Sequence, residues 1–264
     1  MDLSGVDPAT FAQMCAGYFQ PGFFEGTGNN NASVLLQYAN QPPDRDLVQQ
    51  AVAYLDRWYP GWSADELSRD VRIVVTDQIP STEGGSCRQD GSDHPGFILI
   101  GAGGWHEPVG MASGLAHEAR HIENSKLLPG LTINQDESDA WKVAATVYMK
   151  AAGETTDPAL RQSYLTTGNR NYFLGEQIGR CQLDYFQPQT YLWTLNAWVD
   201  LQAYVAQNYG LSDGQYRLVN SDREAPDSTP SASAQYTFYL DAGAGQPITI
   251  KLTVDETADL VREK

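Results

Sequence analysis

The chain has few of the residues that cross-link a protein or direct it into a membrane. Its three cysteines, Cys15, Cys87 and Cys181, form no C-x-x-C pair, which argues against a disulfide framework or a cysteine-rich metal site and leaves one disulfide open. No apolar run is long enough to span a bilayer, and the first residues lack the basic and apolar regions of an export signal. We therefore expect a soluble protein that is cytoplasmic or is secreted by a non-classical or specialised route.

Basic residues are also scarce, with 17 lysines and arginines against 33 aspartates and glutamates and a formal net charge of -16. The summed field of such a chain repels nucleic acids and anionic membrane surfaces, so we expect neither as a partner. Hydrophobic residues at 41% and charged residues at 19% are typical of a globular protein. A chain of 264 residues can form one large domain or one domain with appendages. The composition does not indicate an oligomeric state.

Apolar periodicity and turn signals predict helices and strands along the chain. The predicted helices are Pro8–Gln20, Asp44–Tyr59, Pro108–Asn124, Gln135–Ala152, Pro158–Leu183 and Gln189–Tyr209. The predicted strands are Val71–Val75, Gly96–Gly101, Gln215–Val219, Gln235–Asp241 and Ile248–Val254, and the polar residues 81–95 are a loop or a hairpin connection. This order indicates an α+β protein with a mostly helical second half and a small C-terminal β appendage.

One short stretch, Ala116–Ile122 (A-H-E-A-R-H-I), contains an H-E-x-x-H motif within a helical pattern. On a helix, His117 and His121 lie one turn apart on the same face, so both imidazoles can bind one zinc ion with Glu118 beside it. Gly114 lies one turn before the first histidine. It either leaves room above the metal or allows close packing against a strand, and the sequence does not separate the two.

Catalytic zinc has three protein ligands and leaves another position to water, so the motif requires one more ligand. Glu137 is the candidate, because it lies near the start of the next helix and shares an inward face with Ala140. Asp136 is a competing ligand. Asn134-x-x-Glu137 is also close to a capping box, in which Glu137 would have a purely structural role.

H-E-x-x-H on one helix followed by E-x-x-A on the next resembles the gluzincin branch of the zincin metallopeptidases, especially its small forms. The resemblance covers roughly residues 70–152. It implies that His117, His121 and Glu137 bind zinc, that Glu118 is the catalytic base, and that a strand before the motif helix binds the substrate backbone. Residues 1–60 and 210–264 match no family pattern. We expect a zincin-like domain at 61–209, with an N-terminal helical segment at 1–60 packed on it and the β appendage at 210–264.

The sequence departs from the gluzincin pattern at one position. Several gluzincins have an aspartate four residues after the glutamate ligand, where this chain has Trp141. Asp139 lies in a different sector of the helix, so it is either a partner for a histidine ligand or a solvated or capping acid. The third histidine of the metzincins is absent, because that position is Leu127.

The predicted function is that of a zinc-dependent metalloendopeptidase that acts on a peptide or protein substrate. Zinc lowers the pKa of its bound water to about 7, Glu118 takes a proton as the water attacks the carbonyl, and the same carboxyl protonates the leaving amine. One alternative is a zinc amidase that acts on cell-wall or other non-protein amides. A second is a catalytically idle zincin-fold binding or effector module, for which an intact Glu118 would not be needed.

Several other residues have candidate roles that the sequence leaves open. A tyrosine, histidine or arginine can stabilise the oxyanion, and the candidates are Tyr148, Tyr172, Tyr191, Arg170, Arg180 and His94. Cys87 is either a thiolate that caps the zinc or an ordinary loop cysteine. Residues 23–31 faintly resemble the F-F-D-G-T-x-N-N opening of bacterial type VI effector lipases, which would require a G-x-S-x-G nucleophile elbow. We expect no such elbow in this chain and do not base the predicted function on that resemblance.

Overall fold

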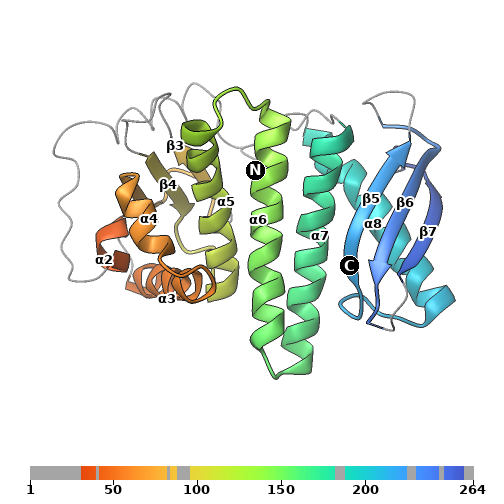
Figure 1. The fold of residues 1–264 in the computed structure, drawn as a ribbon, viewed down its shortest axis with the longest axis horizontal. Helices are drawn as coiled ribbons and strands as arrows, with labels where there is room; N and C mark the ends of the chain where they lie inside the picture. Colours follow the sequence, from red (N-terminus) through yellow and green to blue (C-terminus); the bar gives the residue numbers. More distant parts are fainter. Residues whose placement is uncertain are drawn as a thin grey trace. The chain divides into compact units, whose positions relative to one another are not determined.

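The computed structural model describes residues 31–39, 42–81, 84–87, 96–181, 188–224, 230–243 and 247–258. These residues form the predicted α+β arrangement and are mostly helical (Figure 1). The predicted helix Pro8–Gln20 lies outside the described residues. The chain divides into two compact units, Met1–Leu131 and Thr132–Lys264.

The first unit contains a four-stranded sheet in the order β1-β2-β4-β3. β1 (Leu36–Tyr38), β2 (Val71–Thr76) and β4 (Gly96–Gly101) are parallel. β3 (Gly84–Cys87) pairs antiparallel with β4 and is the edge strand of the described sheet. The sequence predicts β2 and β4 but leaves residues 84–87 in a loop or a hairpin connection. The reason is that the segment G-G-S-C has no alternation of apolar and polar residues, so its strand conformation depends on pairing with β4.

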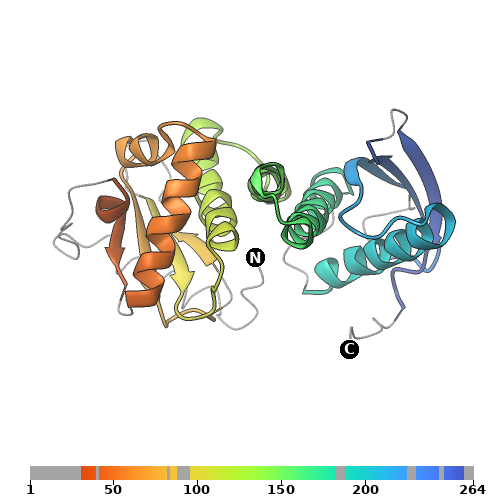
Figure 2. The same ribbon diagram turned by 90° about the horizontal axis from the view of Figure 1, so that it is seen from below.

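Helices cover the sheet of the first unit (Figure 2). All six residues of β4 and five of the six residues of β2 are buried, as expected for parallel strands covered on both faces. α3 (Pro42–Trp58) packs beside α5 (Pro108–Leu127), and α5 also contacts β3 and β4. Two short helices, α2 (Asn31–Leu35) and α4 (Trp62–Ser68), contact β2.

The start of α5 follows the signal in the sequence. The carboxylate of Glu107 accepts hydrogen bonds from the backbone N–H groups of Val109 (3.1 Å) and Gly110 (2.6 Å), and Pro108 occupies the first turn. An acidic N-cap satisfies N–H groups that have no partner within the helix and interacts favourably with the helix dipole. The predicted core face of α5 is confirmed, since its four apolar residues are at most 3% exposed: Ala112, Leu115, Ala119 and Ile122.

The second unit begins with two helices packed along their lengths, α6 (Ile133–Glu154) and α7 (Pro158–Cys181). Glycines on α7 allow a close approach. A Cβ at Gly175 would lie 2.9 Å from the carbonyl oxygen of Ser138, and a Cβ at Gly179 would lie even closer to the hydroxyl of the same serine. α6 continues one residue past Gly153, which was predicted to end the helix at Ala152.

The N-cap of α6 is Thr132, two residues before the predicted Asn134. The Thr132 hydroxyl accepts a hydrogen bond from the Gln135 backbone N–H at 3.3 Å, and the Gln135 side-chain oxygen accepts one from the Thr132 backbone N–H at 2.9 Å. This reciprocal pair is a complete capping box. The proposed capping role of Glu137 is therefore wrong, because Gln135 occupies the capping position.

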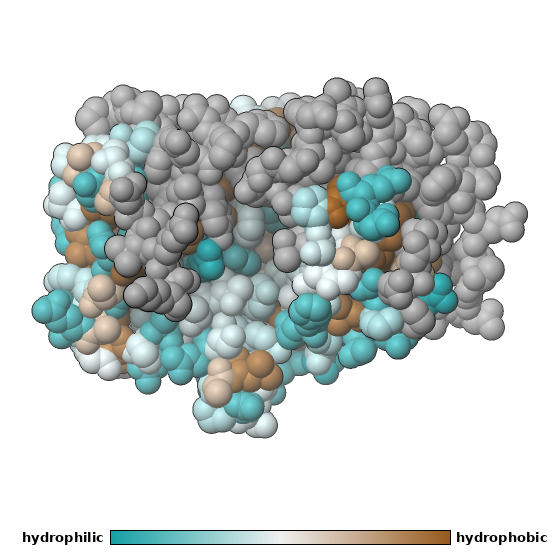
Figure 3. Space-filling model, turned by 180° about the vertical axis from the view of Figure 1, so that it is seen from behind, coloured by the Kyte–Doolittle hydropathy of each residue, from teal (hydrophilic) through white to brown (hydrophobic). Residues whose placement is uncertain are grey.

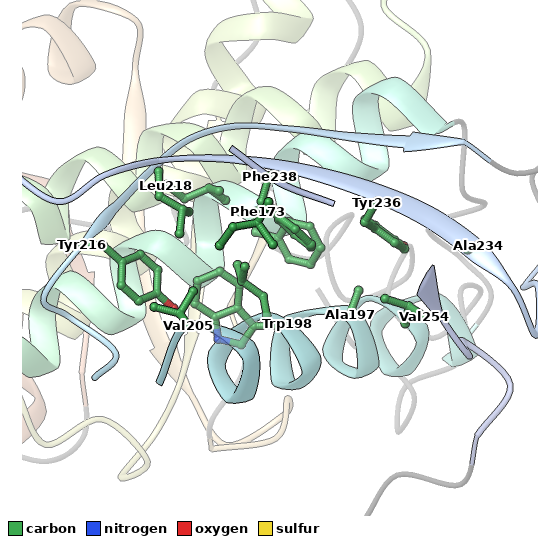
Figure 4. Close-up of a cluster of buried hydrophobic side chains, with 13 residues drawn as sticks. Phe173, Ala197, Trp198, Val205, Tyr216, Leu218, Ala234, Tyr236, Phe238 and Val254 are labelled. Atoms are coloured by element: carbon green, nitrogen blue, oxygen red, sulfur yellow. The ribbon is translucent and has the colours of Figure 1, made fainter. Parts of the chain in front are cut away.

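A three-stranded antiparallel sheet completes the second unit in the order β5-β6-β7. β5 (Arg217–Glu224), β6 (Ala234–Asp241) and β7 (Ile248–Val254) confirm the three predicted strands, with β5 shifted toward the C-terminus. Side chains of α7, α8 (Pro188–Tyr209) and the sheet form one apolar core (Figure 4). Its aromatic members are Phe173, Trp198, Tyr216, Tyr236 and Phe238. The β strands of the predicted appendage thus share a core with the preceding helices.

The described surface shown in Figure 3 has hydrophobic residues scattered among hydrophilic ones. Among the described helices, none combines the length and the apolar character that crossing a bilayer requires.

Candidate metal centre

The H-E-x-x-H motif lies in the middle of α5, where all three of its functional side chains are buried. His117, Glu118 and His121 are 6%, 4% and 3% exposed. The Nε2 atoms of the two imidazoles lie 3.1 Å apart, and the ring planes are nearly perpendicular at 79°. Two nitrogens that share a tetrahedral zinc ion with bonds of about 2.0–2.1 Å would be roughly 3.3 Å apart. The two rings therefore present the nitrogens that one ion would bridge.

The edge strand β3 lies against the carboxylate of Glu118. A Cβ added at Gly84 would be 3.2 Å from Glu118 Oε1 and 3.5 Å from its Cγ. The absence of a side chain at this position therefore allows the carboxylate to approach the backbone of the strand. This contact was not predicted, because the sequence places residues 84–87 in a loop or a hairpin connection.

The role of Gly114 is resolved by its contact with Trp105, which lies between β4 and α5. A Cβ at Gly114 would be 2.8 Å from Trp105 Cη2 and 3.3 Å from Cζ3. The glycine is thus explained by close packing, but the neighbour is an indole ring and not the strand that the sequence suggested. The space one turn before His117 is filled by this ring.

Glu137 joins the two histidines in a group that can hold a metal ion. It lies in the second turn of α6 and is 7% exposed. One ligand atom each from His117, His121 and Glu137 lies within 4.8 Å of the others, and all three residues are buried. Among the described residues, this is the group of histidine, cysteine and acidic side chains whose ligand atoms lie close enough together to hold one metal ion.

The donor set fits the ion that the motif implies. Two imidazole nitrogens and one carboxylate oxygen match the ligands of a catalytic zinc site, which retains an open position. Imidazole ligands also suit copper, iron and nickel, so the donor set indicates a metal-binding group and not one particular metal.

The two acidic residues near Glu137 on α6, Asp136 and Asp139, do not belong to the metal-binding group. Asp136 is 5% exposed but does not belong to the metal-binding group, so it is not supported as the competing ligand. Asp139 lines a cavity of about 310 Å³ together with Gln135, Ser138, Lys142 and Gly179. It therefore lies on a different face of α6 from Glu137, as the helical spacing predicts.

The structure describes only some of the candidate oxyanion donors. The Tyr172 hydroxyl donates to the carbonyl oxygen of Val219 at 3.1 Å, and the ring of Tyr148 lies 6.1 Å from that of Tyr164. Arg170 lies on α7. The side chains of Tyr191, Arg180, His94 and Cys87 are outside the described part of the chain, and no donor is assigned.

Contrary to the expectation that the chain has no G-x-S-x-G motif, one match is present at 210–214 (G-L-S-D-G), but it lacks the structure of a nucleophile elbow. Ser212 lies after α8 and before β5, the reverse of the strand–turn–helix order that the elbow requires. Its hydroxyl donates to Gln215 Oε1 at 2.9 Å and accepts from Gln162 Nε2 at 3.3 Å. In this class of hydrolase the catalytic histidine follows the serine along the chain, but all four histidines of this chain precede residue 132. The stretch therefore does not support a lipase.

A buried carboxyl group lies between α4 and the C-terminal half of α5, and no pattern in the sequence predicts it. Glu66 is 3% exposed and forms an ion pair with Arg69 at 3.2 Å, and Arg69 also contacts Glu123 on α5 at 3.4 Å. Burial raises the pKa of Glu66 to about 7, and Arg69 only partly opposes this effect. The carboxyl therefore gains a proton near neutrality.

This raised pKa predicts that stability depends on pH. Between about pH 4.5 and 7 the folded state holds a proton that the unfolded state has lost, so the free energy of unfolding falls as pH rises through this window. Glu66→Gln is expected to raise the free energy of unfolding by about 1–3 kcal/mol at pH 8 and to change it little at pH 4.5. Denaturant titrations at the two pH values measure both quantities.

Asp65→Asn is the matched control, because Asp65 is on the same helix and its side chain is 55% exposed. Its effect should remain within about 0.5 kcal/mol at both pH values. An equal change for Glu66→Gln at pH 4.5 and pH 8 would contradict the assigned pKa.

Comparison of the chain with models of protein families, with curated proteins and with solved structures gives no match. The functional interpretation therefore depends on the residues and the geometry of this chain alone.

Proposed function

We propose that the protein is a zinc-dependent metalloendopeptidase with a zincin-like fold and a gluzincin-type centre. The observation that carries the proposal is the buried group of His117, His121 and Glu137, whose ligand atoms lie within 4.8 Å of one another. Glu118 adjoins this group and is buried without belonging to it. A structural metal site does not require this extra carboxylate, whereas a hydrolytic site requires a base.

The arrangement of the first unit supports the same interpretation. The motif helix α5 contacts the antiparallel edge strand β3, and Gly84 of that strand lies against Glu118. An extended peptide can add to a sheet edge through backbone hydrogen bonds. A substrate held in this way along β3 would have its backbone close to the carboxylate of Glu118.

The residues then have separate roles in hydrolysis. His117 and His121 would hold the zinc through Nε2, and Glu137 would hold it through a carboxylate oxygen. When bound, zinc polarises the substrate carbonyl and lowers the pKa of a coordinated water to about 7. Glu118 takes a proton from the attacking water at a carboxylate oxygen and returns it to the leaving amine as the C–N bond breaks. The backbone of β3 orients the peptide.

Metal analysis tests the centre directly. The purified protein is expected to contain about one zinc ion per chain, and His117→Ala to contain less than about a tenth of that, because one imidazole ligand is lost. His106→Ala is the matched control, since His106 is exposed and lies just before α5. It should keep the zinc content of the wild type. A wild type without zinc, or a His117→Ala variant with unchanged zinc, would contradict the proposal.

A substrate panel separates the proposed peptidase from its alternatives. Zinc-loaded protein is incubated with casein, with unstructured peptides and with peptidoglycan. Cleavage of protein or peptide substrates supports the proposal. Release of products from peptidoglycan alone would identify an amidase, and bound zinc without turnover of any of the three would indicate an idle module.

A further inference from the structure

The indole of Trp105 packs on the motif helix at Gly114, in space that a side chain on any other residue would occupy. Its benzo edge faces Gly114, where a Cβ would lie 2.8 Å from Cη2, 3.3 Å from Cζ3 and 3.5 Å from Cζ2. The side chain is partly exposed, while its Nε1 atom is buried and has no hydrogen-bond partner among the residues that the structure describes. Packing of the ring edge on the glycine, and not a hydrogen bond, therefore defines this contact.

Helix geometry places this contact beside the metal-binding group. At 100° per residue, Gly114 lies on the same stripe of α5 as His117, Glu118 and His121, since these follow it by three, four and seven residues. Residues three or four apart on a helix have Cβ atoms about 5–6 Å apart. The ring edge over Gly114 is thus one helical turn from Glu118 and from the first histidine.

A substrate would meet this ring at the scissile bond. The carbonyl that is attacked must lie within about 3–3.5 Å of the water that Glu118 activates. A side chain that flanks the scissile bond extends several ångströms from that point, and Gly114, on which the indole packs, is one helical turn from Glu118, about 5–6 Å between Cβ positions. A ring that already fills this space leaves little room for another large side chain.

We propose that Trp105 is a specificity-determining residue that restricts one substrate position next to the scissile bond to glycine, alanine or a similarly small residue. Gly114 makes this possible, because any larger residue would displace the ring. The inference rests on the proposed peptidase function and adds the class of substrate that the site accepts.

Kinetics on matched peptides test the restriction. Fluorogenic peptides that differ only in the residues flanking the scissile bond carry alanine or phenylalanine at each position. At the restricted position, the wild type should cleave the alanine peptide with a higher kcat/KM than the phenylalanine peptide. Trp105→Ala should raise the ratio of kcat/KM for the phenylalanine peptide to that for the alanine peptide at least about tenfold. Tenfold is the lower limit for a change of size in an apolar pocket. Trp62→Ala, a tryptophan replacement on α4, should keep the preference of the wild type.

A second measurement does not require turnover. The affinities of acetohydroxamate and benzohydroxamate for the zinc-loaded protein are measured by calorimetry, since both bind an open metal position and they differ in size. Trp105→Ala should shift the ratio of the two affinities toward benzohydroxamate at least about tenfold. Trp105→Phe, which retains a smaller ring, should give an intermediate shift and serves if the alanine variant does not fold.

The outcomes separate the inference from the proposed function. If the protein binds zinc and cleaves none of the peptides but the hydroxamate ratio shifts, the peptidase proposal fails and the steric role of Trp105 stands. If the peptides are cleaved but neither the peptide preference nor the hydroxamate ratio changes in Trp105→Ala and Trp105→Phe, the inference is overturned. A wild type that prefers phenylalanine at both flanking positions would also overturn it.

Discussion

Replacing Glu118 with glutamine is expected to lower kcat/KM for peptide hydrolysis about 10²–10⁴-fold, the contribution of a positioned general acid–base group. Glutamine has nearly the same size and shape, so the contact with Gly84 on β3 is retained. It cannot take a proton from water and return it to the leaving amine. Since Glu118 does not belong to the metal-binding group, the zinc content should remain at about one ion per chain.

Two further variants serve as comparisons for Glu118→Gln, one that removes a metal ligand and one that is a matched control. His117→Ala should lose both zinc and activity, because it removes a ligand and not only a proton carrier. Glu123→Gln is the matched control, since Glu123 is on the same helix and its carboxylate contacts Arg69 and Arg120. It should keep zinc and change kcat/KM by less than about threefold. Full activity in Glu118→Gln with zinc bound would show that this carboxyl is not the base.

The parts of the fold that could be predicted are those with a local signal. Gly96–Gly101 is an apolar run between glycines and forms β4 with those bounds. Glu107 and Pro108 mark the start of α5, where they provide an N-cap and a first-turn proline. The i, i+4 spacing of His117 and His121 was sufficient to predict convergent imidazoles, because helix geometry alone determines which residues share a face.

The parts that could not be predicted depend on partners far along the chain. β3 is a strand because β4 provides its hydrogen bonds, and its own sequence is weakly extended at best. The contact of Trp105 with Gly114 requires knowing where the β4–α5 connection folds. Glu66 is buried where Arg69, at the end of α4, contacts Glu123 of α5, which is 54 residues further along the chain. In each case the deciding interaction is tertiary.

A buried ion pair in the second unit also joins residues that are far apart in the sequence, because it links β5 to the segment after β7. Arg223 Nε and Nη2 lie 2.6 and 2.7 Å from the two carboxylate oxygens of Glu256, and the side chains are 2% and 1% exposed. The Tyr236 hydroxyl and the Ser231 backbone N–H also donate to this carboxylate, at 2.5 and 2.8 Å. The carboxylate thus accepts hydrogen bonds from all four of these groups, and a buried charge is tolerated when it is paired and hydrogen-bonded in this way.

Glu256→Ala is accordingly expected to lower the free energy of unfolding by about 3–5 kcal/mol, because the guanidinium of Arg223 would remain buried without its counter-charge. Two donors, from Tyr236 and Ser231, would also lose their acceptor. Arg217→Ala is the control, since its ion pair with Asp241 spans 3.5 Å and both side chains are about half exposed, at 58% and 49%. That variant should change stability by less than about 1 kcal/mol. Chemical denaturation measures the free energy of unfolding of both variants. If Glu256→Ala lost as little stability as Arg217→Ala, the prediction would be wrong and the buried ion pair would stabilise the fold no more than the exposed one does.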